Sequence, residues 1–402
     1  MERLVENRHS PRDTVTRRRE RPRWLTVGLM VVIAIAVVAC VGGQDEAIAL
    51  YEDGRAMAEE GRWEQAAASF GQVIDLGPSD TGLLARAHID RGLSLSELGR
   101  TEEAIADATA AIELQPDDTD MLAQAYVNRS FDLSDTGRVE EAIADTSAAI
   151  DLQPDDTDIL AQAYVNRSGY LLELGQVEAA IADATAAIDL QPDDTDILAL
   201  AYLNRGIALS EVGRTEEALA DETAVIESQP DDTNVLARAY LNRSSTLGAV
   251  GRAEESAADA TAAIDLQPDD TDILAKAYLN RSISLRALGR TEEAIADATV
   301  AINLQPRDHY ALALAYLNRS LVLGGLGRFD EALADATAII DLQPTDTDTL
   351  ARAHMARAVA LDSLGRTDEA VPDLQAITEI LPPSHELNRL VTELLADMGN
   401  SD

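Results

Sequence analysis

The sequence predicts an all-α solenoid of nine two-helix units, each 38 residues long, with a helix covering its C-terminal end. A glycine recurs every 38 residues, at Gly61, Gly99, Gly137, Gly175, Gly213, Gly251, Gly289, Gly327 and Gly365. A proline recurs with the same spacing, at Pro78, Pro116, Pro154, Pro192, Pro230, Pro268, Pro306, Pro344 and Pro382. Aromatic residues are only 3% of the chain, so alanine and leucine dominate the apolar content, which favours closely packed helices. A strict period of this length is the mark of stacked structural repeats.

The first 43 residues differ in composition from the repeats. Residues 1–23 carry an arginine cluster, whereas residues 24–43 are uncharged and almost wholly apolar. An apolar stretch of this length preceded by arginines is typical of a signal sequence or of a membrane anchor with a cytoplasmic N-terminus. We therefore expect a basic cytoplasmic region over 1–23 and a hydrophobic signal or anchor over 24–43.

Cys40 is the only cysteine, which excludes an intrachain disulfide. The run 37–40, Val-Val-Ala-Cys, resembles a bacterial lipobox, in which the cysteine is lipidated and becomes the mature N-terminus. The alternative is an uncleaved single-pass anchor in which Cys40 is one more apolar residue. Both interpretations attach the protein to a membrane of the bacterial cell envelope and place the repeats outside the cytoplasm.

Each repeat shows the start and stop signals of two helices. In the third, an acidic run over 117–120 precedes an amphipathic stretch that ends at Asp135. Gly137 and Arg138 make the turn, and a second stretch runs from Val139 to Leu152. Carboxylates cap a helix N-terminus and favour its positive dipole end, glycine suits the turn between helices, and proline ends the second helix. A Thr-Glu-Glu run, as at 101–103, is expected to cap the second helix in the same way.

Two positions in each repeat are small, which predicts close contact between its two helices. Seven residues before each turn glycine stand Gly54, Gly92, Ser130, Ser168, Gly206, Ser244, Ser282, Ser320 and Ala358. Five residues after it stand Ala66, Ala104, Ala142, Ala180, Ala218, Ser256, Ala294, Ala332 and Ala370. Leucines such as Leu95 and isoleucines such as Ile112 are expected to fill the layer between repeats.

These positions together resemble the tetratricopeptide repeat (TPR). The resemblance covers about residues 45–383 and includes the tyrosine of the Ala-Tyr-Leu-Asn-Arg-Ser segments, the small residues, the turn glycine and the final proline. It implies a right-handed superhelical solenoid over 44–383 that binds proteins. The family unit has about 34 residues, so four are added here. We interpret them as one extra turn of the first helix, buried through Leu122, Leu160, Leu198, Leu236 and Leu274.

The C-terminal residues are predicted to cover the last repeat. Residues 384–398 place Leu387, Leu390, Val391, Leu394 and Leu395 on one side of a helix, and Ser384 is a candidate cap. Such a helix shields the final repeat from water, as solenoids require. Residues 399–402 form a short tail.

A row of asparagines is the candidate peptide-binding site. It comprises Asn128, Asn166, Asn204, Asn242, Asn280 and Asn318, each nine residues before a turn glycine. In long TPR superhelices an asparagine at the matching place grips the backbone of an extended peptide, so the resemblance implies the same role here. A carboxamide both donates and accepts, as a peptide group does. The alternative is an ordinary hydrogen bond between repeats.

A second set of residues predicts ion pairs. Eight residues before and after the turn glycine stand an arginine and an aspartate: Arg91 and Asp107, Arg129 and Asp145, Arg167 and Asp183, Arg205 and Asp221, Arg243 and Asp259, Arg281 and Asp297, Arg319 and Asp335, Arg357 and Asp373. Unit one lacks both residues. Arginine suits partly buried pairing because its guanidinium is rigid and planar. The alternative is an arginine row that binds anions.

Composition limits the remaining functions. The net charge of −40 disfavours nucleic acid, and it favours either basic partners or simply solubility. No catalytic motif, metal-binding motif or cofactor motif is present, and His88 and His354 replace the repeat's tyrosine as packing residues. We expect a non-catalytic scaffold that holds a protein or an extended peptide at the outer side of a membrane. The alternatives are a spacer without a peptide groove and a regulatory subunit of an enzyme complex.

Overall fold

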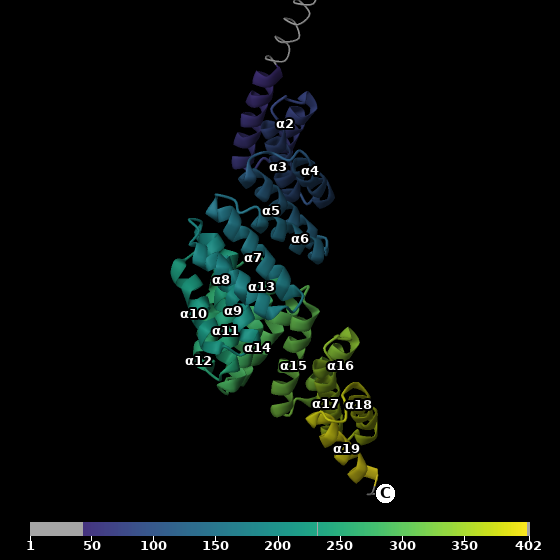
Figure 1. The fold of residues 1–402 in the computed structure, drawn as a ribbon. Helices are drawn as coiled ribbons and strands as arrows, with labels where there is room; N and C mark the ends of the chain where they lie inside the picture. Colours follow the sequence, from purple (N-terminus) through teal and green to yellow (C-terminus); the bar gives the residue numbers. More distant parts are fainter. Residues whose placement is uncertain (1–42, 231, 400–402) are drawn as a thin grey trace, which may run out of the picture. The chain divides into compact units, whose positions relative to one another are not determined.

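The computed structural model describes residues 43–230 and 232–399, and all of the regular structure in them is α-helical (Figure 1). The expected signal or anchor over 24–43 and its Cys40 thus lie essentially outside the described residues. The chain divides into two compact units, Met1–Asp117 and Asp118–Asp402. The first contains a helix over 43–59, α2 (Trp63–Leu76), α3 (Thr81–Glu97) and α4 (Thr101–Glu113).

The second unit continues the same alternation of helices. Its first helices have 17 residues each: α5 (Thr119–Asp135), α7 (Thr157–Glu173), α9 (Thr195–Glu211), α11 (Thr233–Ala249), α13 (Thr271–Ala287), α15 (His309–Gly325) and α17 (Thr347–Ser363). Its second helices are α6 (Val139–Asp151), α8 (Val177–Leu190), α10 (Thr215–Ser228), α12 (Ala253–Asp265), α14 (Thr291–Asn303), α16 (Phe329–Leu342) and α18 (Thr367–Ile380). The helix α19 (Glu386–Gly399) follows.

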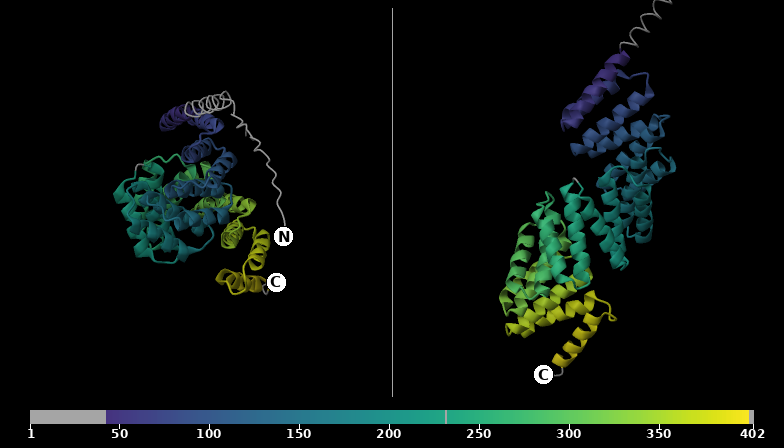
Figure 2. Two further views of the ribbon diagram at one scale, coloured as in Figure 1. Left: turned by 45° about the horizontal axis from the view of Figure 1, so that its top comes forward. Right: turned by 90° about the vertical axis from the view of Figure 1, so that its left-hand side faces the viewer.

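The second unit has an inner and an outer side. Each first helix packs against its own second helix, and each second helix packs against the next first helix. From α5 to α17, successive first helices also contact one another, whereas between α6 and α18 no second helix contacts its successor. Elements that touch their successors lie on the shorter side of a curved stack. The first helices therefore form the inner side of this unit, and the second helices form the outer side (Figure 2).

Aspartate caps the first helices, as predicted. Asp194 accepts hydrogen bonds from the backbone nitrogens of Asp196 (2.8 Å) and Ile197 (3.4 Å), and the aspartates at the matching places act in the same way. The predicted threonine cap of the second helices is wrong. At α4 the N-cap is Arg100, which makes no side-chain cap hydrogen bond, and Thr101 is already helical. The helix starts one residue earlier because it follows directly on the turn at Gly99, and Arg100 instead pairs with Glu103.

A glutamine with a left-handed backbone follows the second helices. Gln191 has φ 49°, and Gln115, Gln153, Gln229, Gln267, Gln305 and Gln343 have φ between 44° and 50°. Left-handed backbone is costly for residues with a Cβ atom and is natural for glycine. In the first repeat the matching residue is Gly77, with φ 58°. The glutamines therefore carry local strain that the first repeat avoids.

Replacing Gln191 with glycine is expected to stabilise the protein by about 0.5–1 kcal/mol, because relief of the left-handed backbone exceeds the added entropy of the unfolded chain. The Gln191 side chain is exposed, so little contact is lost. Urea denaturation followed by circular dichroism measures the change. The reverse substitution, Gly77→Gln, is the control and should destabilise by a similar amount. A loss of stability in Gln191→Gly would contradict this account.

The small positions bring the paired helices together, as predicted. Ser282 of α13 is fully buried and donates to the carbonyl oxygen of Ala294 in α14 (2.6 Å). Ser320 makes the same bond to Ala332 (3.0 Å). At Gly92 a Cβ atom would lie 3.4 Å from the carbonyl oxygen of Ala104, so nothing larger than a small side chain fits.

The added turn of the first helix is buried through a different residue from the one predicted. Ile197, Val235 and Ile273 are 6–8% exposed, while Leu198, Leu236 and Leu274, one residue later, are only half-buried. One residue is a rotation of about 100° on a helix. Because the helix begins at the threonine, its third residue points into the layer between repeats and the leucine lies at the edge.

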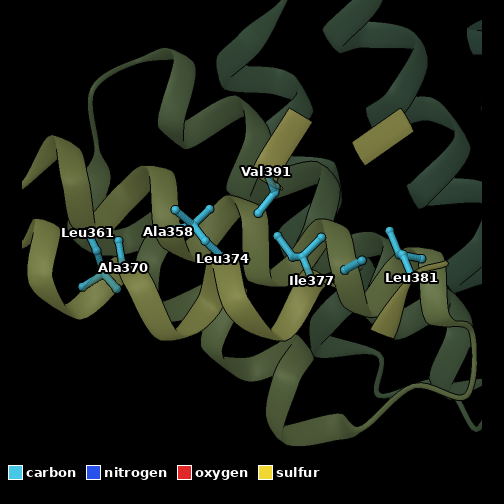
Figure 3. Packing of buried hydrophobic residues seen from close by; sticks show 8 residues of the cluster. Ala358, Leu361, Ala370, Leu374, Ile377, Leu381 and Val391 are labelled. Carbon is cyan, nitrogen blue, oxygen red and sulfur yellow. The ribbon is translucent and has the colours of Figure 1, made fainter. Parts of the chain in front are cut away.

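The helix α19 covers the last repeat. Val391 is fully buried against Leu374 and Ile377 of α18, and Leu387 and Leu395 pack around the same cluster (Figure 3). Leu390, predicted to lie on the same apolar face, is 53% exposed. The buried face is narrower than the sequence suggested, because α19 ends the described stack and packs mainly on α18. At its start His385 Nδ1, rather than Ser384, accepts from the backbone nitrogen of Leu387 (3.2 Å).

Candidate functional site

Each predicted arginine and aspartate meet within one repeat. Arg205 of α9 donates from Nε to Asp221 Oδ2 (2.7 Å) and from Nη2 to Asp221 Oδ1 (2.8 Å), and the other seven repeats that carry the pair show the same forked contact. The aspartates are buried. The hydrogen bond to Asp221 raises the pKa of Arg205, and burial opposes this shift. The pair thus locks the first helix of a repeat to its second.

The same arginines reach back to the preceding repeat. Arg243 donates from Nη1 to Thr223 (3.1 Å), and Arg319 donates to Thr299 (2.9 Å). Arg167 makes the matching bond to Ser147 (3.0 Å). These guanidinium donors are used inside the array, so the geometry favours a structural role over an anion-binding row.

The repeat's tyrosine lies against the paired arginine, a contact that sequence reasoning missed. In six repeats the guanidinium carbon Cζ of the arginine lies 5.2–5.7 Å from the centre of the tyrosine ring, as it does for Arg205 and Tyr202. This distance suits a cation–π interaction. The available signal was the spacing of three residues between tyrosine and arginine, which places both on one helix face.

Histidine takes the tyrosine's place in two repeats and bonds to the aspartate instead. His88 Nδ1 lies 2.8 Å from Asp107, and His354 Nδ1 lies 2.7 Å from Asp373. Burial alone would raise the pKa of Asp107, but hydrogen bonds from His88 and Arg91 outweigh it and lower that pKa. Both histidines are therefore part of the ion-pair network in addition to being packing residues.

The asparagine row divides into two groups. Asn204 donates to Ser168 Oγ (2.8 Å) and to the Val165 carbonyl (3.1 Å), both in the preceding first helix. Asn280 and Asn318 likewise donate to the preceding first helix, to the Leu241 carbonyl and to Ser282 Oγ. In these three repeats the amide serves the junction between repeats, the alternative that the sequence left open.

The other asparagines have different surroundings. Asn128 and Asn166 accept at Oδ1 from Gln124 and Gln162 of their own helices (2.6 and 2.5 Å), and both are partly exposed. The Asn242 amide nitrogen is buried and meets no acceptor among the described residues. Asn128 and Asn166 thus remain the members of the row best placed to meet another molecule.

Large apolar side chains lie exposed on the same helix face as the asparagines. They stand three residues after the asparagine position and form what we call the inner stripe: Phe131, Ile283, Leu321 and Val359 in the second unit, exposed by 60, 36, 48 and 53%. In the first unit, Leu93 at the matching place is 46% exposed. Residues three apart are neighbours on a helix surface. Sequence reasoning missed the stripe, although the recurring apolar residue was visible.

A pocket lies beside the inner stripe at the C-terminal end of the array. The pocket has a volume of about 300 Å³ and lies between α15 and α17, with Leu321, Met355 and Val359 in its walls and Leu387 of α19 also lining it. Gly324 and Gly325 keep it open, since no atom lies within 4 Å of the place a Cβ would occupy on either. The pocket can take an apolar side chain from another molecule.

The inner side changes character along the second unit. Two residues before the turn glycine, repeats three to five carry the exposed acids Asp135, Glu173 and Glu211. The next four repeats carry small uncharged residues at that place: Ala249, Ala287, Gly325 and Ser363. The inner side is therefore acidic at its N-terminal end and apolar near the pocket.

Comparison with known proteins assigns the repeat. Models described as tetratricopeptide repeats match residues 51–119 and 310–385, residues 161–194 and 237–270, and residues 274–345, which together exceed half of the chain. The chain contains tetratricopeptide repeats. The TPR resemblance seen in the sequence is thereby confirmed. No curated protein sequence matches this TPR chain.

Solved structures share the TPR fold. The Cut9 and Hcn1 hetero-tetramer of APC/C aligns with a TM-score of 0.55 at 13% identity, over 86% of this chain and 75% of that one. A TPR protein from Parabacteroides merdae aligns with a TM-score of 0.49 at 18% identity, over 67% and 97%. YrrB, a TPR protein with an unusual peptide-binding site, aligns with a TM-score of 0.38 at 24% identity, over 56% and 99%. The likeness to the Cut9 and Hcn1 structure, whose TM-score is 0.55, supports the all-helical solenoid and nothing finer.

The described part of the TPR chain offers no metal centre and no membrane span. Among residues 43–230 and 232–399, no three His, Cys, Asp or Glu side chains are grouped to hold a metal ion. Within the same ranges no helix combines the length and apolar character needed to cross a bilayer.

Proposed function

We propose that this TPR array is a non-catalytic scaffold whose inner side holds a segment of a partner protein. The inner stripe and its pocket carry the proposal, because large apolar side chains exposed on consecutive repeats, as are Ile283, Leu321 and Val359, are typical of interaction sites. Apolar anchors in pockets supply most of the binding energy at protein interfaces. The TPR fold supports the same conclusion at a coarser level.

The chemistry of the inner side defines the partner segment. Apolar side chains would occupy the pocket beside Leu321 and Val359, while basic side chains would face Asp135, Glu173 and Glu211, which attract cations. Asn128 and Asn166 would bond to the peptide groups of an extended segment. The partner is thus a protein segment with apolar residues at one end and basic residues at the other.

We further propose that the array is displayed outside the cytoplasm by its N-terminal segment. The support is the sequence alone: the arginine cluster of 1–23 and the apolar run of 24–43 that ends near Cys40. Protease added to intact spheroplasts should then digest the repeats. Mass spectrometry of the N-terminal peptide distinguishes a lipidated Cys40 from an uncleaved anchor, and protection of the repeats from protease would contradict the location.

Leu321→Asp is expected to weaken partner binding at least about tenfold, because it puts a charge in the apolar pocket. The partner is first identified by crosslinking in native membranes, and its affinity for purified variants is then measured by calorimetry. Val300→Asp is the matched control. Val300 is 37% exposed, but it lies on the second helix α14 at the outer side.

The helical content and thermal melt of both variants should match the parent protein. Retained affinity in Leu321→Asp, with loss in Val300→Asp, would place the interface on the outer side. Retained affinity in both variants would favour a spacer without a binding groove.

A further inference from the structure

One repeat carries a buried acid where the others carry none. Glu222 of α10 is 1% exposed. The matching residues of the other repeats are Phe70, Ala108, Thr146, Ala184, Ala260, Ala298, Ala336 and Leu374. Gly206 of α9 makes room for it, since a Cβ there would lie 3.4 Å from Glu222 Cγ. A buried carboxyl costs free energy unless it is neutral or fully paired, so this residue needs an explanation.

The hydrogen bonds around Glu222 suit a protonated acid. Its Oε1 lies 2.9 Å from Thr246 Oγ1 of α11, and its Oε2 is buried and has no hydrogen-bond partner among the residues that the structure describes. Thr246 Oγ1 also lies 3.0 Å from the Asn242 carbonyl oxygen, which can only accept. A hydroxyl has one proton to give. If Thr246 donates it to Asn242, Glu222 must donate to Thr246, which requires the neutral carboxylic acid.

The nearby charges leave Glu222 without a cation of its own. Asp221 is next to it on α10 and is paired with Arg205 of α9. Arg243 of α11 is paired with Asp259 of α12. The pKa of the Glu222 carboxyl is raised to about 7, mainly by burial and to a smaller extent by Asp259 and Asp221, while the hydrogen bond to Thr246 and the charge of Arg243 oppose the shift.

A chain of hydroxyls joins Glu222 to the surface. Thr246 Oγ1 lies 3.1 Å from Ser210 Oγ of α9, and Ser210 is exposed. Hydroxyls also meet in the next layer, where Ser256 Oγ lies 2.8 Å from Ser284 Oγ and 3.1 Å from Ser244 Oγ, and the other repeats carry alanine at the position of Ser256. Protons can therefore reach Glu222 from the surface through Ser210 and Thr246.

We propose that Glu222 is a proton-binding site that controls the junction of repeats five and six. With Glu222 neutral, α9, α10 and α11 pack closely. With Glu222 ionised, an unpaired charge lies in the core and the junction opens more often. The native state holds this proton to higher pH than the unfolded chain does, so the junction's stability falls as pH rises from about 4.5 to about 7. This inference goes beyond the scaffold role and does not depend on it.

Amide hydrogen exchange of the full chain at about pH 6 and about pH 8.5 tests the proposal. The measured exchange rates are divided by the rates expected for unstructured peptides at the same pH. The opening equilibrium of α9–α11 is then compared with that of α15–α17 in the same sample. We expect the opening of α9–α11 to increase about tenfold more than that of α15–α17, as proton linkage with these two pKa values requires.

Glu222→Gln removes the charge and keeps the shape, and Glu222→Ala copies the residue found in five other repeats. Both variants should abolish the differential pH effect and leave α15–α17 unchanged. The proposal is overturned if the parent shows no differential opening, or if the effect persists in both variants. Since alanine already occupies this place in neighbouring repeats, at least one variant is expected to fold.

Discussion

Arg205→Leu is expected to destabilise repeat five by about 3 kcal/mol, because removing one partner of a buried ion pair leaves the other charge uncompensated. The change leaves Asp221, 5% exposed, as a buried charge without its partner. It also removes the bonds of Arg205 to the preceding repeat and its contact with Tyr202. Because long arrays unfold in segments, hydrogen exchange in α9 and α10 is the appropriate measurement.

The double variant Arg205→Leu with Asp221→Leu separates pairing from packing. Removing both charges leaves nothing unpaired, so the double variant should recover most of the stability lost in the single one. Arg214→Leu is the matched control, because Arg214 makes the same forked contact with Glu217 on the exposed surface, and no measurable change is expected there. A double variant no more stable than either single variant would refute the pairing.

Leu203→Ala should cost about 3 kcal/mol, within the usual range for a fully buried leucine. Leu203 is 0% exposed and packs with Val225 of α10 and with Val235 and Ala239 of α11. The substitution therefore removes contacts that join repeats five and six, and neighbouring repeats should lose cooperativity as well. Thermal and urea melts followed by circular dichroism measure the loss.

Leu321→Ala is the matched control for the core substitution. Leu321 stands on α15 and is 48% exposed on the inner stripe, so its truncation should change stability by no more than about 0.5 kcal/mol. It should nevertheless reduce partner binding. A loss of stability similar to that of Leu203→Ala would show that the inner stripe is structural and would remove its main support as an interface.

Regularity within one repeat was readable from the sequence. The 38-residue period predicted the helix pairs, the aspartate caps and the small contacts such as Ser282 on Ala294. Arg205 and Asp221 meet as their equal distances from Gly213 suggested. These features depend on helix geometry and on one short turn, which are the same in every repeat and are therefore encoded locally.

Contacts between repeats were not readable in the same way. The sequence placed Leu198 in the added turn's core, where the structure buries Ile197, and it did not decide whether Asn204 faces a ligand or the preceding helix. Both outcomes depend on how far each repeat is rotated relative to the preceding repeat. A rotation that corresponds to one helical residue buries a different side chain and leaves the original one at the edge of the interface.

The chain by itself thus determined the repeat, its helices, the aspartate caps of the first helices and the ion pair inside each repeat. Only the tertiary structure decided which asparagines are used in the array, which apolar residues remain exposed as the inner stripe, and that Glu222 is buried beside Thr246. The physical reason is the range of the interactions. Turn geometry and helical period act over a few residues, whereas the rotation between stacked repeats is set by the packing of whole helix pairs.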